Sequence, residues 1–435
     1  MDTVPRRHPN SCASSHMYNG HVTITSSPRA MRFVWLMVAL LFGFCFVSYM
    51  ERVNISIAIQ LMMPDLALTK GQASFLFNSF LLGYAIFQMP AGWLGDRFGP
   101  RIVLAVSALC WGLLTVFTGL LPAAKTHSVT EILLTGCLLR FLLGATEATT
   151  FPVATRAIFQ WVGEEKRAFC NSLLFVGTST AAAFTAPLVS WVMMQHGWRA
   201  AFYVTSLFAF VLVPLWLCVA PSGGVSNRTL ADRTPEKSGP LFTRDVVLLS
   251  LSYIAEGYLL FTFISWLYVY LVEYRGFSLL RGGLLTSAPW IAAIIATPVG
   301  GYVSDWLTAR KGRIQSARII IIASHTLSSA LILEGALTKN RILAVAALSA
   351  SLGFLYFAES SFWTSMSILA GKRSGLASGF MNMFGVLGGV VANASVPLIA
   401  ERMGWSAAFG SCAVAGFCCA GVLCFMRGDA EARLS

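Results

Sequence analysis

The feature that most constrains this chain is a series of hydrophobic runs, each about twenty residues long, that recurs along nearly the whole sequence. A run of that length can cross the hydrocarbon core of a bilayer as an α-helix. Charged residues make up only 11% of the chain, against about 25% in soluble proteins. The period-two alternation of a membrane barrel is absent from the sequence. These patterns predict an all-α protein that crosses a membrane many times.

We expect twelve transmembrane helices arranged as two six-helix repeats, with limits good to about two to four residues. Their expected ranges are 33–61, 72–94, 102–121, 132–160, 168–194, 200–219, 246–273, 282–305, 317–336, 342–370, 374–400 and 405–426. The long polar stretch 220–245 has the composition of a flexible cytoplasmic linker. It separates an N-terminal half, 32–219, from a C-terminal half, 246–427. Polar tails precede and follow them at 1–31, which we expect to be disordered, and 428–435.

The distribution of Lys and Arg predicts the orientation. With these helices, 21 basic residues fall on the side of both tails and eight on the other side. Loops rich in Lys and Arg stay in the cytoplasm, so both termini are expected there. The absence of a targeting signal and the short outer loops favour a bacterial inner membrane.

Short motifs repeat between the halves at nearly one spacing. The matches are Gly92–Asp96 with Gly301–Asp305, Gly197–Phe202 with Gly404–Phe409, and Lys166-Arg167 with Lys372-Arg373. Each half keeps the same orientation, so an axis along the membrane normal is expected to relate them. Substrate sites in such proteins lie between the halves near the midplane.

Several classes of function do not fit the sequence. The net charge of +12 is accounted for by basic cytoplasmic loops, and no nucleic-acid motif accompanies it. The ten cysteines mostly lie in hydrophobic runs without metal-ligand spacing, so we expect neither a metal nor a cofactor. No HExxH or GxSxG motif indicates an enzyme. A non-transporting sensor would need an output domain, and the tails and linker hold none.

Charged residues inside the fourth expected helix are the strongest local signal. Arg140 and Glu147 are seven residues apart, so they point the same way on a helix, about 10 Å apart along its axis. Gly144 lies between them and allows a close approach of another backbone or a ligand. An arginine near a membrane centre costs about 2.5–3.5 kcal/mol and usually faces a cavity or a partner. An ion pair that only locks helix packing is the alternative.

The loop Gly92-Trp93-Leu94-Gly95-Asp96-Arg97-Phe98-Gly99-Pro100-Arg101, between the second and third expected helices, resembles the GxLaDrxGxr signature of the major facilitator superfamily. Together with the two repeats, this resemblance implies the major facilitator fold. It also implies that the loop gates the inner side during alternating access. The residues that carry the match are Gly92, Asp96, Arg97, Gly99 and Arg101.

Further residues resemble the anion:cation symporter branch, which includes hexonate and hexuronate symporters and animal organic-anion carriers. The branch's first-helix pattern is similar to residues 49–56, YMERVNIS, and its fourth-helix pattern to residues 140–152. Tyr84, Gln88 and Pro90 match the end of its second helix. The chain departs from the branch at Tyr268, where a proline is common, and at Val386, where a second asparagine is common.

Six charged residues lie at depth on helices that, by this resemblance, line the cavity: Glu51, Arg52, Arg140, Glu147, Glu256 and Glu359. We expect Arg52 to bind a substrate carboxylate, because a guanidinium offers a bidentate fork. The resemblance implies that Glu51 and Glu147 carry protons and that Arg140 modulates Glu147. Glu256 and Glu359 are candidates for proton or substrate binding, with a structural role left open. His325 is expected to be structural.

Polar and aromatic residues at similar depth could hold hydroxyls or rings of a substrate: Tyr49, Tyr84, Thr178, Trp363, Thr364 and Asn382. Ordinary packing is the alternative for each. The leading hypothesis is a monomeric secondary transporter that couples a small organic anion to protons. A sugar acid or another carboxylate is favoured, since an acid-rich cavity suits a monoanion. An organic-phosphate antiporter, or another anion antiporter or facilitator, is the alternative.

Overall fold

The computed structural model describes residues 28–162, 164–221, 243–370 and 374–426, and the structural statements below concern these residues. They form helices throughout. Their bounds are α1 Pro28–Leu66, α2 Lys70–Gly119, α3 Val129–Glu147, α4 Thr150–Trp161, α5 Glu164–Val219, α6 Arg244–Val269, the π-helical turn η1 Tyr270–Tyr274, α7 Leu279–Lys311, α8 Arg313–Leu337, α9 Arg341–Ala370, α10 Ser374–Met403 and α11 Trp405–Leu423.

Ten helical segments within the described residues are long and apolar enough to cross a membrane. The all-helical expectation is confirmed, whereas the count of twelve is not settled, because α2 and α5 each run through two expected helices. Each contains one residue with non-helical dihedrals, Gly99 at φ 78° and Gly197 at φ 80°. Only glycine adopts such angles without strain, so the chain bends at these two points. Gly404, which the repeat matches to Gly197, also has a positive φ of 86°.

Polar caps fix several helix starts on the side away from the first residues of α1. Thr69 accepts a hydrogen bond from the Gln72 amide, and the Gln72 side chain accepts one from the Thr69 amide. Ser128 and Glu131 form the same capping box at the start of α3. Each box satisfies amides that the first helical turn leaves unpaired. The short connections before α2 and α3 are therefore well defined by the sequence.

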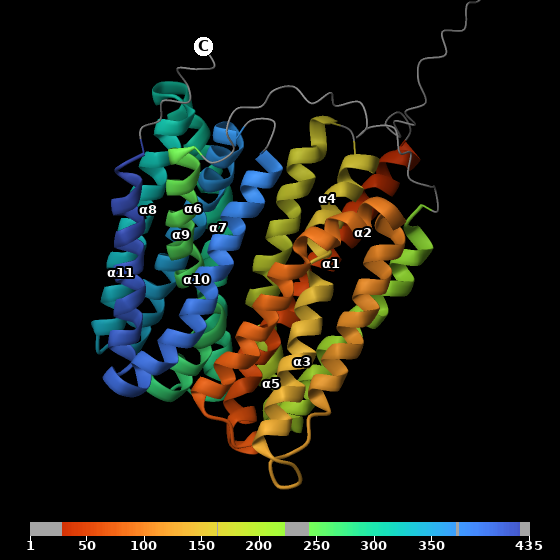
Figure 1. Cartoon of the computed structure of the whole chain (residues 1–435), viewed down its shortest axis with the longest axis vertical. Coiled ribbons are helices and arrows are strands. Elements are labelled where there is room, and N and C mark those ends of the chain that lie inside the picture. The colour runs from red at the N-terminus through yellow and green to blue at the C-terminus, as the bar shows by residue number, and fades with distance from the viewer. Residues whose placement is uncertain (1–27, 163, 222–242, 371–373, 427–435) are drawn as a thin grey trace, which may run out of the picture.

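The helices form two groups side by side, α1–α5 and α6–α11, which we call the N-half and the C-half (Figure 1). The start of α1, the end of α5, the start of α6 and the end of α11 lie at the same end of the molecule. Most of the expected linker and both expected tails lie outside the described residues. Contacts between the halves come mainly from α5 with α7, α2 with α10, and α1 with α6.

The hydrogen bonds between the halves gather toward the end opposite the start of α1. Ser74 donates to the Asn393 carbonyl at 2.7 Å, and Asn78 donates to the Val390 carbonyl at 3.3 Å. A Lys70–Glu273 ion pair of 2.7 Å adds to them. These contacts close the halves against each other at that end.

Within the N-half, α2 and α3 cross at very close range. A Cβ added at Gly144 would overlap the Phe80 carbonyl and lie 2.9 Å from the Tyr84 amide nitrogen. The opposite residue, Gly83, packs in the same way against the Phe141 carbonyl. Small residues at such crossings allow helix backbones to touch in a membrane. The expected close approach at Gly144 is confirmed, and the neighbour is α2.

We predict that Gly144→Ala lowers the free energy of unfolding by about 1–3 kcal/mol, because the added methyl forces two backbones apart. Gly410→Ala on α11 is the matched control, since a Cβ there meets nothing within 4 Å. Equilibrium unfolding in mixed micelles measures both. Equal stability of the two variants would contradict the observed crossing.

Candidate functional site

Arg52 and Glu147 form a buried ion pair between α1 and α3. The Arg52 Nε and Nη2 atoms both lie 3.3 Å from Glu147 Oε2. Ser48, one turn before Arg52, donates to the same oxygen at 3.2 Å. The Glu147 side chain is fully buried and that of Arg52 is 11% exposed. The sequence indicated both residues but did not pair them, and Ser48 was not foreseen.

Aromatic rings enclose the Arg52 guanidinium. Its central carbon lies 5.2 Å from the centroid of Tyr49, 4.9 Å from that of Phe80 and 4.6 Å from that of Tyr84. Such cation–π contacts contribute about 0.5–2 kcal/mol each, more when water is excluded. The rings attract the guanidinium, while its Nε and Nη2 atoms remain directed at Glu147. An anion could therefore replace Glu147 on Arg52 while the rings stay in place.

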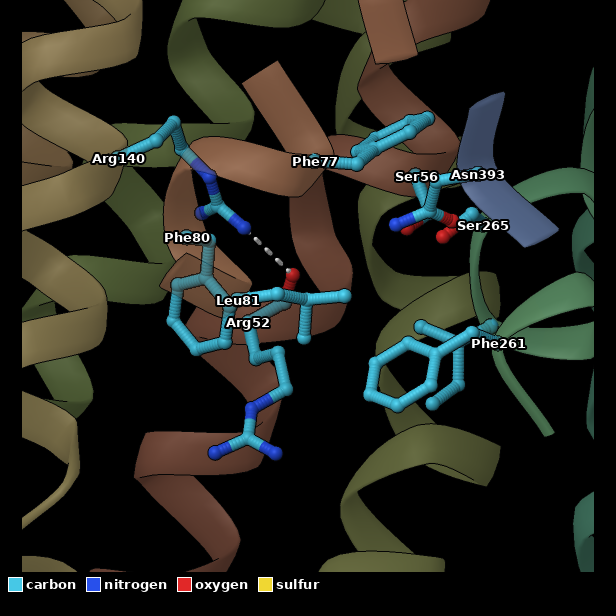
Figure 2. Close-up of a pocket in the computed structure, with 10 residues that line it drawn as sticks. Arg52, Ser56, Phe77, Phe80, Leu81, Arg140, Phe261, Ser265 and Asn393 are labelled. Atoms are coloured by element: carbon cyan, nitrogen blue, oxygen red, sulfur yellow. Dashed lines mark hydrogen bonds between the residues drawn. The ribbon is translucent and has the colours of Figure 1, made fainter. Parts of the chain in front are cut away.

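Arg140 is bound to the backbone of α1. Its Nη2 donates to the Arg52 carbonyl at 3.2 Å and its Nη1 to the Glu51 carbonyl at 3.4 Å. Figure 2 shows the Arg140 guanidinium directed at the Arg52 carbonyl, while the Arg52 side chain runs away from it. The structure thus gives Glu147 the partner Arg52, and Arg140 anchors the stretch of α1 that carries Arg52. The Glu51 carboxyl oxygens are buried and have no hydrogen-bond partner among the described residues.

The helix is interrupted directly after Glu147. α3 ends at Glu147 and α4 begins at Thr150. Pro152 has no amide hydrogen to donate to the Ala148 carbonyl, which weakens the helix at this point. The Thr149 hydroxyl at this junction donates to the Ser107 hydroxyl at 2.9 Å. The expected single helix over 132–160 is therefore two helices, and their junction lies beside the buried carboxylate.

The C-half holds two further acids with different surroundings. Glu256 on α6 is buried, and its Oε2 lies 2.8 Å from Nε2 of His325 on α8. Glu359 on α9 is half-buried and accepts hydrogen bonds from the Tyr253 hydroxyl at 2.8 Å and the Trp363 indole at 2.7 Å. Tyr253 was not foreseen, although it lies one turn from Glu256, a spacing that places both on one side of α6.

Some of the other expected substrate residues contact the opposite half, and others bond only within their own helix or are exposed. Asn382 on α10 donates to Gln88 on α2 at 3.3 Å, which joins the halves. Tyr49 lies 6.1 Å from Trp290 of the C-half, ring centroid to centroid. Thr178 is buried and donates to the Phe175 carbonyl of its own helix. Thr364 is exposed.

The expected gating loop is mostly helical and bends at Gly99. Arg97 lies over the rings of Trp93 and Phe98, at 5.3 and 5.6 Å. Arg101 donates to the Leu217 carbonyl at 2.8 Å. Gly92 has open space where a Cβ would lie. The side chain of Asp96 is outside what the structure describes.

A small cavity lies beside the arginines on the closed side of the interface. It is lined by Arg52, Ser56, Phe77, Phe80, Leu81, Arg140, Phe261, Ile264, Ser265 and Asn393 and has room for about one water molecule. Figure 2 shows the polar ends of Ser56, Ser265 and Asn393 together on one side of it. The Arg52 guanidinium points away from this group, and the cavity is too small for an organic substrate.

Comparison with known proteins decides the family. The family model of the Major Facilitator Superfamily matches residues 40–393. The chain belongs to this superfamily. It is therefore an integral, multi-pass membrane protein of a transporter family, not an enzyme. A crystal structure of a bacterial homolog of the human lysosomal transporter Spinster, inward-facing and unoccupied, has the same fold. Its TM-score is 0.70 at 15% identity, over 92% of this chain and 96% of that chain.

Curated relatives confirm the resemblance to the anion-transporting branch of the major facilitator superfamily. A probable sulfoacetate transporter of Cupriavidus necator is 32% identical over 364 residues, which are 79% of this chain and 82% of that protein. The hexuronate transporter of Bacillus subtilis is 27% identical over 377 residues, which are 83% and 87% of the two chains.

We predict strong coupling between Glu256 and His325. Breaking a buried pair leaves one polar group unpartnered, so Glu256→Gln and His325→Gln should each lower the free energy of unfolding by about 3–5 kcal/mol. The double variant should cost clearly less than the sum of the two. Equilibrium unfolding in mixed micelles measures the cycle, with the exposed Glu401→Gln as control. Additive losses would show that the pair is not energetically coupled.

Proposed function

We propose that this protein is a proton-coupled symporter of an organic anion in a bacterial inner membrane, with both termini in the cytoplasm. In this proposal α2 and α5 each cross the membrane twice, and α3 and α4 together cross it once, which gives twelve crossings in two six-helix repeats. The bends at Gly99 and Gly197 support that division, as does the positive φ at Gly404. The N-half and C-half would rock around a central site.

The observation that carries the proposal is the Arg52–Glu147 ion pair. Glu147 is fully buried, and a buried carboxylate stays ionised when a cation is next to it. A substrate carboxylate that binds Arg52 takes that cation away from Glu147. The carboxyl of Glu147 then favours its neutral, protonated form. Anion and proton would load together and leave together, which is symport.

The remaining charges support this cycle in different ways. Arg140 would hold the Glu51–Arg52 backbone in position and keep a second positive charge near Glu147. Glu51 is buried without a hydrogen-bond partner among the described residues and is the second candidate proton carrier. Trp363 and Asn382 would contact the substrate from the C-half. The segment Gly92–Arg101 would gate the cytoplasmic side.

The relatives support an organic acid as the cargo. One is named for sulfoacetate and another for hexuronate, and both names denote small organic anions. The main alternative is antiport of an organic phosphate against phosphate, by a site with an arginine in each half. Between Arg244 and Arg275 this chain has no Lys or Arg, so α6 offers no second cation at depth. We therefore favour a symported carboxylate.

We predict that Glu147→Gln uncouples transport. In proteoliposomes with an acid exterior, the wild-type protein should accumulate one of a panel of labelled hexuronates, aldonates and sulfonated acids above equilibrium. The variant should only equilibrate the same anion, because its side chain cannot exchange a proton. Glu334→Gln, an exposed acid on α8, is the control and should accumulate normally.

Two outcomes would contradict this proposal. If Glu147→Gln accumulates the anion as well as wild type, Glu147 does not carry the coupling proton. If the anion ignores the pH gradient but enters when the vesicles are preloaded with phosphate, the protein is an antiporter.

A further inference from the structure

Glu359 presents one carboxyl oxygen that the protein does not use. Its Oε1 accepts hydrogen bonds from the Tyr253 hydroxyl and the Trp363 indole, and Oε2 accepts none from the described residues. The residue is half-buried, whereas Glu51, Glu147 and Glu256 are all buried. Two donors on one oxygen stabilise the ionised carboxylate and fix its orientation. The Glu359 carboxylate is thus held in one orientation, and its Oε2 atom can accept a hydrogen bond from another group.

Glu359 lies one turn from a residue of α9 that interacts with the N-half. Tyr356, one turn earlier, interacts with Tyr49 of the N-half, and both rings contact Trp290 at about 6 Å. Tyr49 in turn lies against the Arg52 guanidinium. A chain of aromatic side chains therefore runs from the cation of the N-half to the carboxylate of the C-half.

The neighbouring acid does not supply a compensating charge. His325 Nδ1 lies 3.0 Å from the Ile321 carbonyl, which can only accept, so Nδ1 carries a hydrogen. Nε2 lies 2.8 Å from Glu256 Oε2, close enough for one proton to lie between the two atoms. The pair has no net charge whichever atom holds that proton. When it is ionised, Glu359 is then the net negative group of this region.

The expected membrane-spanning ranges of the C-half offer Glu359 no basic partner. The ranges 246–273, 282–305, 319–336, 342–370 and 374–400 of the C-half contain no Lys or Arg. A second anionic group on the substrate would therefore meet a carboxylate and no basic partner at depth. A hydroxyl or another hydrogen-bond donor of the substrate could instead donate to Oε2 of Glu359.

From these contacts we infer that the site is bipolar and selects a monoanion: Arg52 binds the carboxylate, and Glu359 binds a hydrogen-bond donor at the far end of the substrate. The preferred substrate class is a hydroxylated monocarboxylic acid, and the corresponding dicarboxylic acid is rejected. This inference rests on the proposed transport of an organic anion. It assigns Glu359 to substrate selection and leaves proton coupling to the N-half.

The test compares acids of equal length that differ only at the far end. D-Gluconate ends in a hydroxymethyl group where D-glucarate ends in a second carboxylate, and glycerate and tartronate form a shorter pair. Inhibition of substrate exchange in proteoliposomes without a pH gradient measures their relative affinities independently of proton coupling. Wild type should prefer the monoacid of a pair by about tenfold or more, since like charges brought together are strongly unfavourable.

Glu359→Gln should reduce that preference to about threefold or less, mainly by improving the diacid, because the repulsion is removed while a polar side chain remains. Tyr253→Phe removes one of the two bonds that orient Glu359 and should lower the preference part of the way. Glu401→Gln, which is exposed at the end of α10, should keep the wild-type ratio.

The other outcomes separate this inference from the proposed function. Equal affinities for monoacid and diacid in wild type, or an unchanged ratio in Glu359→Gln, would overturn the bipolar site while organic-anion transport stands. Retained selectivity with loss of pH-driven accumulation would make Glu359 a proton carrier instead. If neither a monoacid nor a diacid is exchanged, the proposed substrate class fails and this inference fails with it.

Discussion

The structure depends on the cost of placing charge inside a membrane. An isolated charge at the bilayer centre is unfavourable by about 2.5–3.5 kcal/mol on insertion scales, so such a residue needs a partner. Arg52 and Glu147 are each other's partner, and both side chains are largely buried. A buried pair of this kind gives little net stability, because desolvation offsets much of the attraction. Its presence is better explained by a partner exchange during transport.

Other features of the N-half hold this pair in place. Arg140 fixes the carbonyls of residues 51 and 52, and Gly144 lets α3 lie directly against α2. The break between α3 and α4 follows Glu147 immediately. The ranges 246–273 and 342–370 of the C-half contain no Lys or Arg, and their acids Glu256 and Glu359 are bound by His325 and by neutral donors. The two halves therefore differ chemically, and in the proposed function this difference would orient the substrate.

The sequence was informative at positions where a residue type is energetically unfavourable unless the structure has one particular feature. Long apolar runs predicted the helices, and charges inside them singled out Arg52, Arg140, Glu147, Glu256 and Glu359, all of which proved to be buried or half-buried. The match of residues 92–101 to a superfamily signature predicted the family that comparison confirms. Glycines predicted the close approach at residue 144, since any larger side chain would block it.

What the sequence could not provide is which helices face each other at each depth. Arg140 and Glu147 share a helix face and were expected to act together, yet the rotation of α1 brings Arg52 to Glu147 and leaves Arg140 on carbonyls. His325 was expected to be structural, but its partner Glu256 is on another helix and 69 positions away. Nor do local patterns show that a single non-helical glycine, Gly99 or Gly197, is all that separates two successive helices. Such details arise from tertiary packing, which periodicity does not encode.

The central claim is that an anion on Arg52 causes Glu147 to take up a proton. The most direct measurement is the number of protons bound per anion, from calorimetry of the purified protein near pH 7 in buffers of different ionisation enthalpy. The account predicts uptake of about one proton per anion in wild type and almost none in Glu147→Gln, which should still bind. Binding without proton uptake in wild type, or the same uptake in both proteins, would contradict it.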